Sequence, residues 1–192
     1  MMAEEKTKRT EKKKEQRQAE KKEAKDRMAN KMRQISIEKV VLSVGATGEE
    51  LEKGVKLLSM LTGRKPAKME SRKRIPALGV RPKLEVGAVV TIRKGTEEIL
   101  RRMLATRDDT LKKRQVVDNC FSFGVKEYIE IPGVEYHRDI GIRGLDVTVV
   151  FKRTGRRVKL KKAKAGRIPK RNRIDREEII RFMEEKFGTR FT

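Results

Sequence analysis

Short runs of β-branched and other apolar residues recur along the middle of the chain and predict β-strands. The clearest runs are Ile35–Val44 (ISIEKVVLSV) and Val86–Ile92 (VGAVVTI), which have the length of a strand and end beside glycine or charged residues. Weaker runs of the same kind cover Cys120–Val125, Tyr128–Ile131 and Leu145–Lys152. We therefore expect these segments to supply the strands of a sheet.

Elsewhere the apolar positions change to a helical spacing of three to four residues. Over Glu49–Leu61 they share one face, and Gly63 follows as a stop signal. A second helix is predicted from an N-cap at Thr96 to about Thr106, because acidic residues in its first turn suit the helix dipole.

The last predicted helix covers residues 175–187. Asp175 is suited to cap it, Glu178 closes a capping box, and Gly188 ends it. Because strands and helices alternate irregularly, the predicted fold class is α+β, an antiparallel sheet with helices packed on one face.

The first 33 residues differ from the rest in composition. Met1–Arg33 consists almost wholly of Lys, Glu, Arg, Gln and Ala, so it cannot bury a core. We expect a charged N-terminal extension over residues 1–33 that is disordered, or helical when bound to RNA. Residues 34–192 are expected to form a single α+β domain, in which Lys152–Arg173 is a basic segment before the C-terminal helix.

The basic segment carries twelve Lys or Arg and no Asp or Glu, which predicts a polyanionic partner. We expect it to begin as an antiparallel hairpin through Thr154-Gly155. The cations that we assign to contacts with this polyanion, which the resemblance described below implies to be rRNA, are Arg156, Arg157, Lys159, Lys161, Lys162, Lys164, Arg167, Lys170, Arg171 and Arg173.

A second basic stretch, Lys65–Lys83, contains Pro66, Pro76 and Pro82, so most of it is expected to be extended or looped. Only Glu70 opposes its many cations. Loops held on a rigid sheet commonly carry binding groups, which makes this stretch a candidate binding loop.

The net charge of the chain limits its function. With 51 basic and 28 acidic residues the formal charge is +23, which indicates nucleic acid or an anionic membrane surface. No apolar run approaches the roughly 20 residues that span a bilayer, and the N-terminus does not resemble a signal peptide, so we expect no membrane partner. A single cysteine, Cys120, fits a reducing, cytoplasmic setting.

Enzyme chemistry is sparse in this sequence, and no cofactor or metal is expected. His137 is the only histidine, and Cys120 falls in a predicted apolar strand, where a buried, inert thiol is the usual outcome. The GATG sequence at Gly45–Gly48 lacks the lysine of a phosphate-binding loop and is better explained as a turn. Aromatic residues are only 4% of the chain, which favours recognition of double-helical RNA through its phosphates and shape over base stacking.

Several motifs occur in the order and spacing of a known family. They are KVVLSVG at Lys39–Gly45, LLSMLTGRKP at Leu57–Pro66, VGAVVTIRKG at Val86–Gly95, FSFGVKEYIEIPGVEY at Phe121–Tyr136, IGIRGLDVTVVF at Ile140–Phe151 and IPKRNRI at Ile168–Ile174. Over roughly Met32 to Gly188 the chain resembles large-subunit ribosomal protein family five, of archaeal type. This resemblance implies an α+β fold related to RNA-recognition architecture.

The resemblance also implies a structural function in the cytoplasmic ribosome. Members bind 5S rRNA and attach it to large-subunit rRNA in the central protuberance, contact peptidyl-site tRNA, and bridge to a protein of the small-subunit head. By position, Arg81 matches the arginine that reaches tRNA, and Glu127–Asp146 resembles the part that faces the small subunit. The 5S rRNA site then comprises Ser43, Arg64, Met69, Arg74 and Thr91, together with the neighbouring cations Lys65, Arg72 and Lys73.

Two other classes of function stay open from the residues alone. A free-standing basic RNA-binding or RNA-chaperone module needs only the charge and the α+β body. An RNA-processing enzyme needs an acid/base group or a metal cluster, for which the lone His137 is a poor basis.

Overall fold

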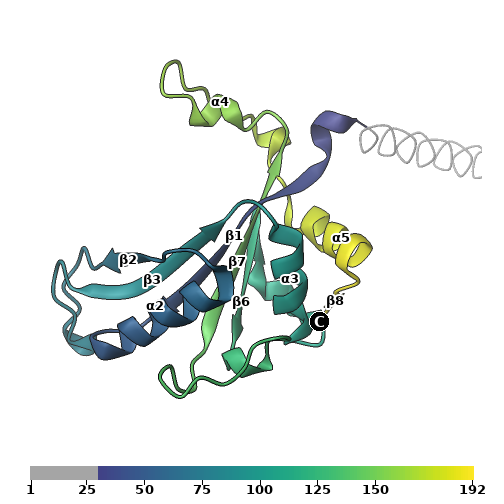
Figure 1. Ribbon diagram of the computed structural model, residues 1–192. Helices are drawn as coiled ribbons and strands as arrows, with labels where there is room; N and C mark the ends of the chain where they lie inside the picture. The colour runs from purple at the N-terminus through teal and green to yellow at the C-terminus, as the bar shows by residue number, and fades with distance from the viewer. Residues whose placement is uncertain (1–29) are drawn as a thin grey trace, which may run out of the picture. The chain divides into compact units, whose positions relative to one another are not determined.

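The computed structural model describes residues 30–192, which separate into two compact units (Figure 1). The larger unit comprises Ile37–Lys152 and Ile174–Thr192. The smaller unit contains Arg153–Arg173 and the described residues up to Ser36. The predicted extension over residues 1–33 therefore falls almost entirely outside the described residues.

The α+β prediction is confirmed, and the main sheet has six strands. Their order across the sheet is β2 (Ala67–Glu70), β3 (Glu85–Ile92), β1 (Ile35–Gly45), β7 (Leu145–Arg153), β6 (Cys120–Val125) and β5 (Val116–Val117). The β1–β3, β2–β3, β5–β6 and β6–β7 pairs are antiparallel.

The pleat of β1 and β3 separates a buried face from an open face. Leu42 pairs with Val90 and Val44 pairs with Ala88, and all four side chains are buried. The residues between them point to the other side, because side chains alternate along a strand.

Helix α2 (Glu49–Thr62) packs on the buried face, as Figure 1 shows. It buries Leu51, Leu57 and Leu58, and it approaches β1 closely at Gly54. A Cβ atom at Gly54 would lie only 2.9 Å from Cγ1 of Val44. As predicted, Gly63 ends the helix in the left-handed conformation, and its N–H donates to the carbonyl of Ser59 over 2.8 Å.

Helix α3 (Thr96–Ala105) lies on the same side of the sheet (Figure 1). The prediction that Thr96 caps this helix is wrong. The N-cap is Gly95, at φ 69°, and Thr96 is the first helical residue with no capping bond from its side chain. Left-handed geometry at this position favours glycine over threonine.

Helix α5 (Arg176–Phe187) confirms the predicted C-terminal helix. The carboxylate of Glu178 accepts from the backbone N–H of Asp175 over 3.3 Å, and Gly188 ends the helix at φ 68°. Phe182 packs edge-on against Phe151 of β7, with ring centroids 5.7 Å apart. After the helix, β8 (Arg190–Phe191) pairs in parallel with β4 (Thr110–Leu111).

One predicted strand and one predicted hairpin are wrong. Tyr128–Ile131 contains a 3-10 helix, η4 (Tyr128–Glu130), because the fully buried Tyr128 folds back: its hydroxyl accepts from the backbone N–H of His137 over 2.9 Å. The hairpin expected through Thr154-Gly155 is absent from the described residues. Gly155, at φ 95°, instead leads into the one-turn helix α4 (Arg157–Leu160).

Two stretches between the longer elements contain short elements. The stretch Lys65–Lys83 holds β2 and the 3-10 helix η2 (Pro76–Leu78). The charged stretch before β6 holds β4, the 3-10 helix η3 (Lys113–Gln115) and β5. Two more 3-10 helices, η1 (Lys31–Arg33) and η5 (Lys170–Asn172), lie in the smaller unit.

Candidate nucleic-acid interface

Three of the predicted 5S rRNA contacts come together on the open face of the sheet. Ser43 pairs across the ladder with Val89, Thr91 pairs with Val41, and Met69 pairs with Gly87. By alternation all of them point away from the face that α2 covers. Ser43 and Thr91 are half-buried, and Met69 is 51% exposed. The three strands β2, β3 and β1 thus present one shared surface.

The open face is built mainly from small apolar side chains, with the hydroxyls of Ser43 and Thr91 among them. Beside Ser43 and Thr91 it carries Val41, Val89 and Ala67 on the same rows of the ladder, and Gly45 opposite Gly87 at the edge. Sequence analysis did not assign Val41, Val89 or Ala67 to the site, although the alternation of β1 and β3 is a signal that could have found Val41 and Val89. A surface of this kind allows a nucleic-acid backbone to approach the sheet closely.

Arg64 brings a positive charge to the margin of this face. It follows the C-terminus of α2, and its guanidinium donates to the carbonyl of Thr91 over 3.4 Å. The side chain is exposed, and this one long bond leaves most of its donors available. Lys65, the next residue, is exposed as well. The structure therefore places Arg64 and Thr91 side by side, as the predicted site requires.

Lys68 behaves differently from its neighbours. Its ammonium donates to Oε2 of Glu85 over 2.7 Å, and this bond and the charge of Glu85 hold the pKa of Lys68 above its ordinary value. Because a carboxylate already balances Lys68, we do not count it among the cations available to RNA.

The remaining predicted contacts lie on the loop between β2 and β3, which has defined internal bonds. At its base the N–H of Ser71 donates to Leu84 and the N–H of Lys83 donates to Ser71, each over 2.8 Å. Nearer the tip Ile75 and Val80 exchange backbone bonds of 3.0 and 3.1 Å around η2. Gly79, at φ 63°, completes this turn.

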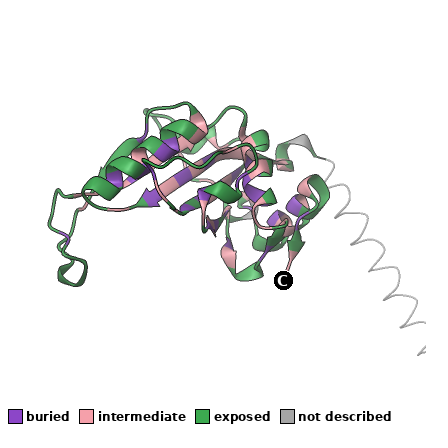
Figure 2. Cartoon of the chain, turned by 60° about the horizontal axis from the view of Figure 1, so that its bottom comes forward, coloured by how far each residue is buried: buried purple, intermediate pink, exposed green. Residues whose placement is uncertain are grey.

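This loop exposes its cations almost continuously. Figure 2 shows it exposed over nearly its whole length. Within the loop, Val80 is buried. Within the described residues no ion pair neutralises its basic side chains. The exposed cations of the loop are Arg72, Lys73, Arg74, Arg81 and Lys83.

The basic segment forms a separate loop in the smaller unit. The N–H of Gly166 donates to the carbonyl of Val158 over 3.1 Å, which closes the chain between them. Within that loop Leu160 is 66% exposed between neighbouring lysines. The predicted rRNA contacts that are exposed in this segment are Arg157, Lys159, Lys161, Lys162, Lys164, Arg167, Lys170 and Arg173. Arg156 is half-buried, and Arg171 lies in η5.

The residues considered for enzyme chemistry do not form a site. Cys120 lies in β6 between Val117 and Val150, and the exposed His137 lies in the loop before β7. In residues 30–192 no group of three or more His, Cys, Asp or Glu is placed to hold a metal ion. Over the same residues no helix is both long and apolar enough to cross a membrane.

Two family models match this chain. One, described as "Ribosomal protein L5", matches residues 30–81, and the other, which describes the C-terminus of the same ribosomal protein family, matches residues 85–182. The first covers β1, α2 and most of the loop between β2 and β3, and the second covers the rest of the sheet and most of α5. The matched residues therefore include the whole open face.

Related proteins of the same description come from several archaea. The large ribosomal subunit protein uL5 of Nanoarchaeum equitans is 38% identical over 165 residues, which is 84% of this chain and 98% of the relative. The protein of that name from Sulfolobus acidocaldarius is 38% identical over 164 residues, with 83% and 92% covered. That of Methanococcus maripaludis is 38% identical over 166 residues, with 82% and 91% covered.

Proposed function

Since the chain belongs to the ribosomal protein L5 family, in its archaeal form, and is thus a structural constituent of the large ribosomal subunit, we propose that its open sheet face binds 5S rRNA. As a protein of this family it is a ribosome component of the cytoplasm and not an enzyme. The observation that carries the proposal is the position of Arg64 beside Thr91, at the margin of the sheet face that also holds Ser43 and Met69.

The chemistry of this surface suits folded RNA. Arg64, Lys65 and the loop cations Arg72, Lys73 and Arg74 are exposed and able to reach phosphates. The hydroxyls of Ser43 and Thr91 provide donors and acceptors for 2′-hydroxyl groups, through which double-helical RNA is read. We infer that the duplex lies across β2, β3 and β1 with its backbone towards the loop.

The returning arm of the β2–β3 loop is proposed to contact peptidyl-site tRNA through Arg81. Val80 is buried and anchors the returning arm of the loop, while Arg81, the next residue, is exposed. Because Arg81 is exposed, its guanidinium is able to reach a second RNA.

Two further contacts complete the proposal. The basic segment, with its closed loop between Val158 and Gly166, is proposed to hold large-subunit rRNA through phosphate contacts. The segment Glu127–Asp146, which exposes Tyr136 and Ile142, is proposed to meet a protein of the small-subunit head.

The proposal is tested by crosslinking 5S rRNA to the full-length protein and mapping the crosslinked residues. We expect crosslinks at Ser43, Arg64, Met69 and Thr91, and on the adjoining loop. Crosslinks confined to the basic segment, with none on the open face, would contradict the proposed 5S rRNA site.

A further inference from the structure

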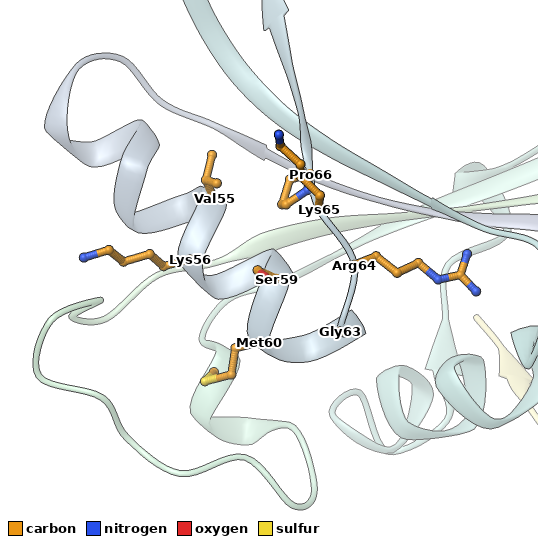
Figure 3. Close-up of a pocket in the computed structure, with 8 residues that line it drawn as sticks. All are labelled: Val55, Lys56, Ser59, Met60, Gly63, Arg64, Lys65 and Pro66. Atoms are coloured by element: carbon orange, nitrogen blue, oxygen red, sulfur yellow. The ribbon is translucent and has the colours of Figure 1, made fainter.

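A shallow pocket of about 570 Å³ lies beside the C-terminal half of α2. Val55, Lys56, Ser59 and Met60 line it from the helix, and Gly63–Pro66 line it from the segment that leads into β2. Figure 3 shows Lys65 and Pro66 opposite Val55, with Ser59 between them and Met60 further along the helix. The volume falls in the range of small-ligand sites, about 300–1,000 Å³, and is ample for one nucleotide.

The walls of the pocket are mainly apolar, but its rim is basic. Val55, Met60 and Pro66 supply the apolar surface, while the exposed Lys56 and Lys65 supply positive charge, and none of the lining residues is acidic. Ser59 adds one hydroxyl that is able to donate or accept a hydrogen bond. An apolar surface beside two cations and a hydroxyl matches a nucleobase with its ribose and phosphate.

The pocket adjoins the proposed 5S rRNA site. Arg64 and Lys65 line the pocket, and Arg64 also reaches away from it to the carbonyl of Thr91 at the margin of the open face (Figure 3). Arg64 therefore connects the pocket with the margin of the open face, so an RNA strand bound at that margin lies near the pocket. A paired base cannot enter a pocket, whereas an unpaired base in a loop or bulge is free to do so.

We propose that this pocket receives one unpaired nucleotide of the 5S rRNA, with the base against Val55, Met60 and Pro66 and the flanking phosphates near Lys56 on one side and Lys65 on the other (Figure 3). This inference rests on the proposed function. It goes beyond that function because it adds readout of a single-stranded position to the recognition of duplex RNA. The apolar wall selects a base, and the cations hold the flanking backbone.

The test fills the pocket without changing any charge. Ser59→Trp places a large side chain in the space, and Ser59→Ala is the matched control that keeps the pocket open. Val117→Trp is a second control, because Val117 is 59% exposed on the edge strand β5 and outside the pocket. The unfolding temperature of each variant shows whether it is folded.

The measurement is the affinity of each folded protein for 5S rRNA, together with a 2′-hydroxyl acylation footprint of the RNA. We expect Ser59→Trp to weaken binding about tenfold, the scale of one lost base contact. The salt dependence should stay the same, and one unpaired nucleotide should gain reactivity. Val117→Trp should bind like the wild-type protein. Ser59→Ala removes only one hydroxyl and leaves the pocket open, so it should weaken binding much less than Ser59→Trp.

If a folded Ser59→Trp protein binds 5S rRNA with wild-type affinity and leaves the footprint unchanged, the inference is overturned. A defect seen only when other ribosomal proteins are present would also overturn it, because the occupant would then be a protein. If the wild-type protein itself fails to bind 5S rRNA, the proposed function fails first, so the two failures are distinguishable.

Discussion

At the scale of single residues, close packing decides which glycines of this fold are replaceable. Gly144 precedes β7, and a Cβ atom there would lie 2.7 Å from the carbonyl oxygen of Lys126 and 2.8 Å from that of Val125. Both neighbours are backbone atoms, which cannot rotate away. A Cβ atom built on Gly45, at the end of β1, would have no atom within 4 Å apart from its own chain neighbours.

We predict that Gly144→Ala lowers the free energy of unfolding by about 1–3 kcal/mol, because the β6–β7 pair must shift to admit the methyl group. Gly45→Ala is the matched control and should change it by no more than about 0.5 kcal/mol. Chemical denaturation of the two proteins measures both effects. Equal stability of the two variants would show that Gly144 is not sterically constrained.

At the scale of elements, the β2–β3 loop holds several exposed cations on a backbone that is joined by its own hydrogen bonds. Its base is closed by the bonds between Ser71 and the residues Lys83 and Leu84, and its tip by the exchange between Ile75 and Val80. The positions of the cations are therefore fixed by backbone bonds that do not involve their side chains. A substitution of one cation should change one contact and leave the loop intact.

We predict that Arg81→Ala weakens retention of peptidyl-site tRNA by about 1–3 kcal/mol, the scale of a charge-assisted hydrogen bond. Folding and 5S rRNA binding should change little, because Arg81 is exposed and is one of many cations. The dissociation rate of tRNA from ribosomes reconstituted with the variant measures the effect. Arg114→Ala, which removes an exposed arginine of η3, is the control.

If tRNA dissociates at the same rate while incorporation of 5S rRNA is impaired, the assignment is reversed. Arg81 would then belong to the 5S rRNA interface, and a different part of the loop would face the tRNA.

The accuracy of the sequence predictions also varies by element. The helices α2 and α5 were predictable because their apolar spacing and their glycine stops agree with the tertiary structure. The strand β2 was not, since its residues are all exposed and it pairs only at the edge with β3. The segment after Glu127 was predicted wrongly because its apolar residues serve to bury Tyr128 instead of extending the sheet.

The candidate site, like the fold, was predictable only in part. The basic stretches were evident from their many Lys and Arg residues, and the resemblance pointed to Ser43, Arg64 and Thr91. The pocket beside α2 was not, because its lining joins Val55 and Met60 of a helix to Lys65 and Pro66 beyond it. Only the folded turn at Gly63 brings these residues to one place.

At the scale of the whole molecule, a formal charge of +23 on 192 residues makes the proposed role electrostatic above all. Within residues 30–192, many of the cations lie in the β2–β3 loop and the basic segment, and the strands β2, β3 and β1 share an open face that carries hydroxyls. Affinity for RNA would then come from many phosphate contacts. The hydroxyls and the shape of the open face would set the orientation of the RNA.

The most direct test of this account is the affinity of the full-length protein for 5S rRNA as a function of salt. With roughly 6–10 phosphate contacts, we predict that affinity falls about 10³–10⁵-fold between 50 and 200 mM salt. Replacing Arg72, Lys73 and Arg74 with glutamine should reduce the slope by about one unit for each lost contact. Binding that is independent of salt, or a slope unchanged by these substitutions, would contradict the account.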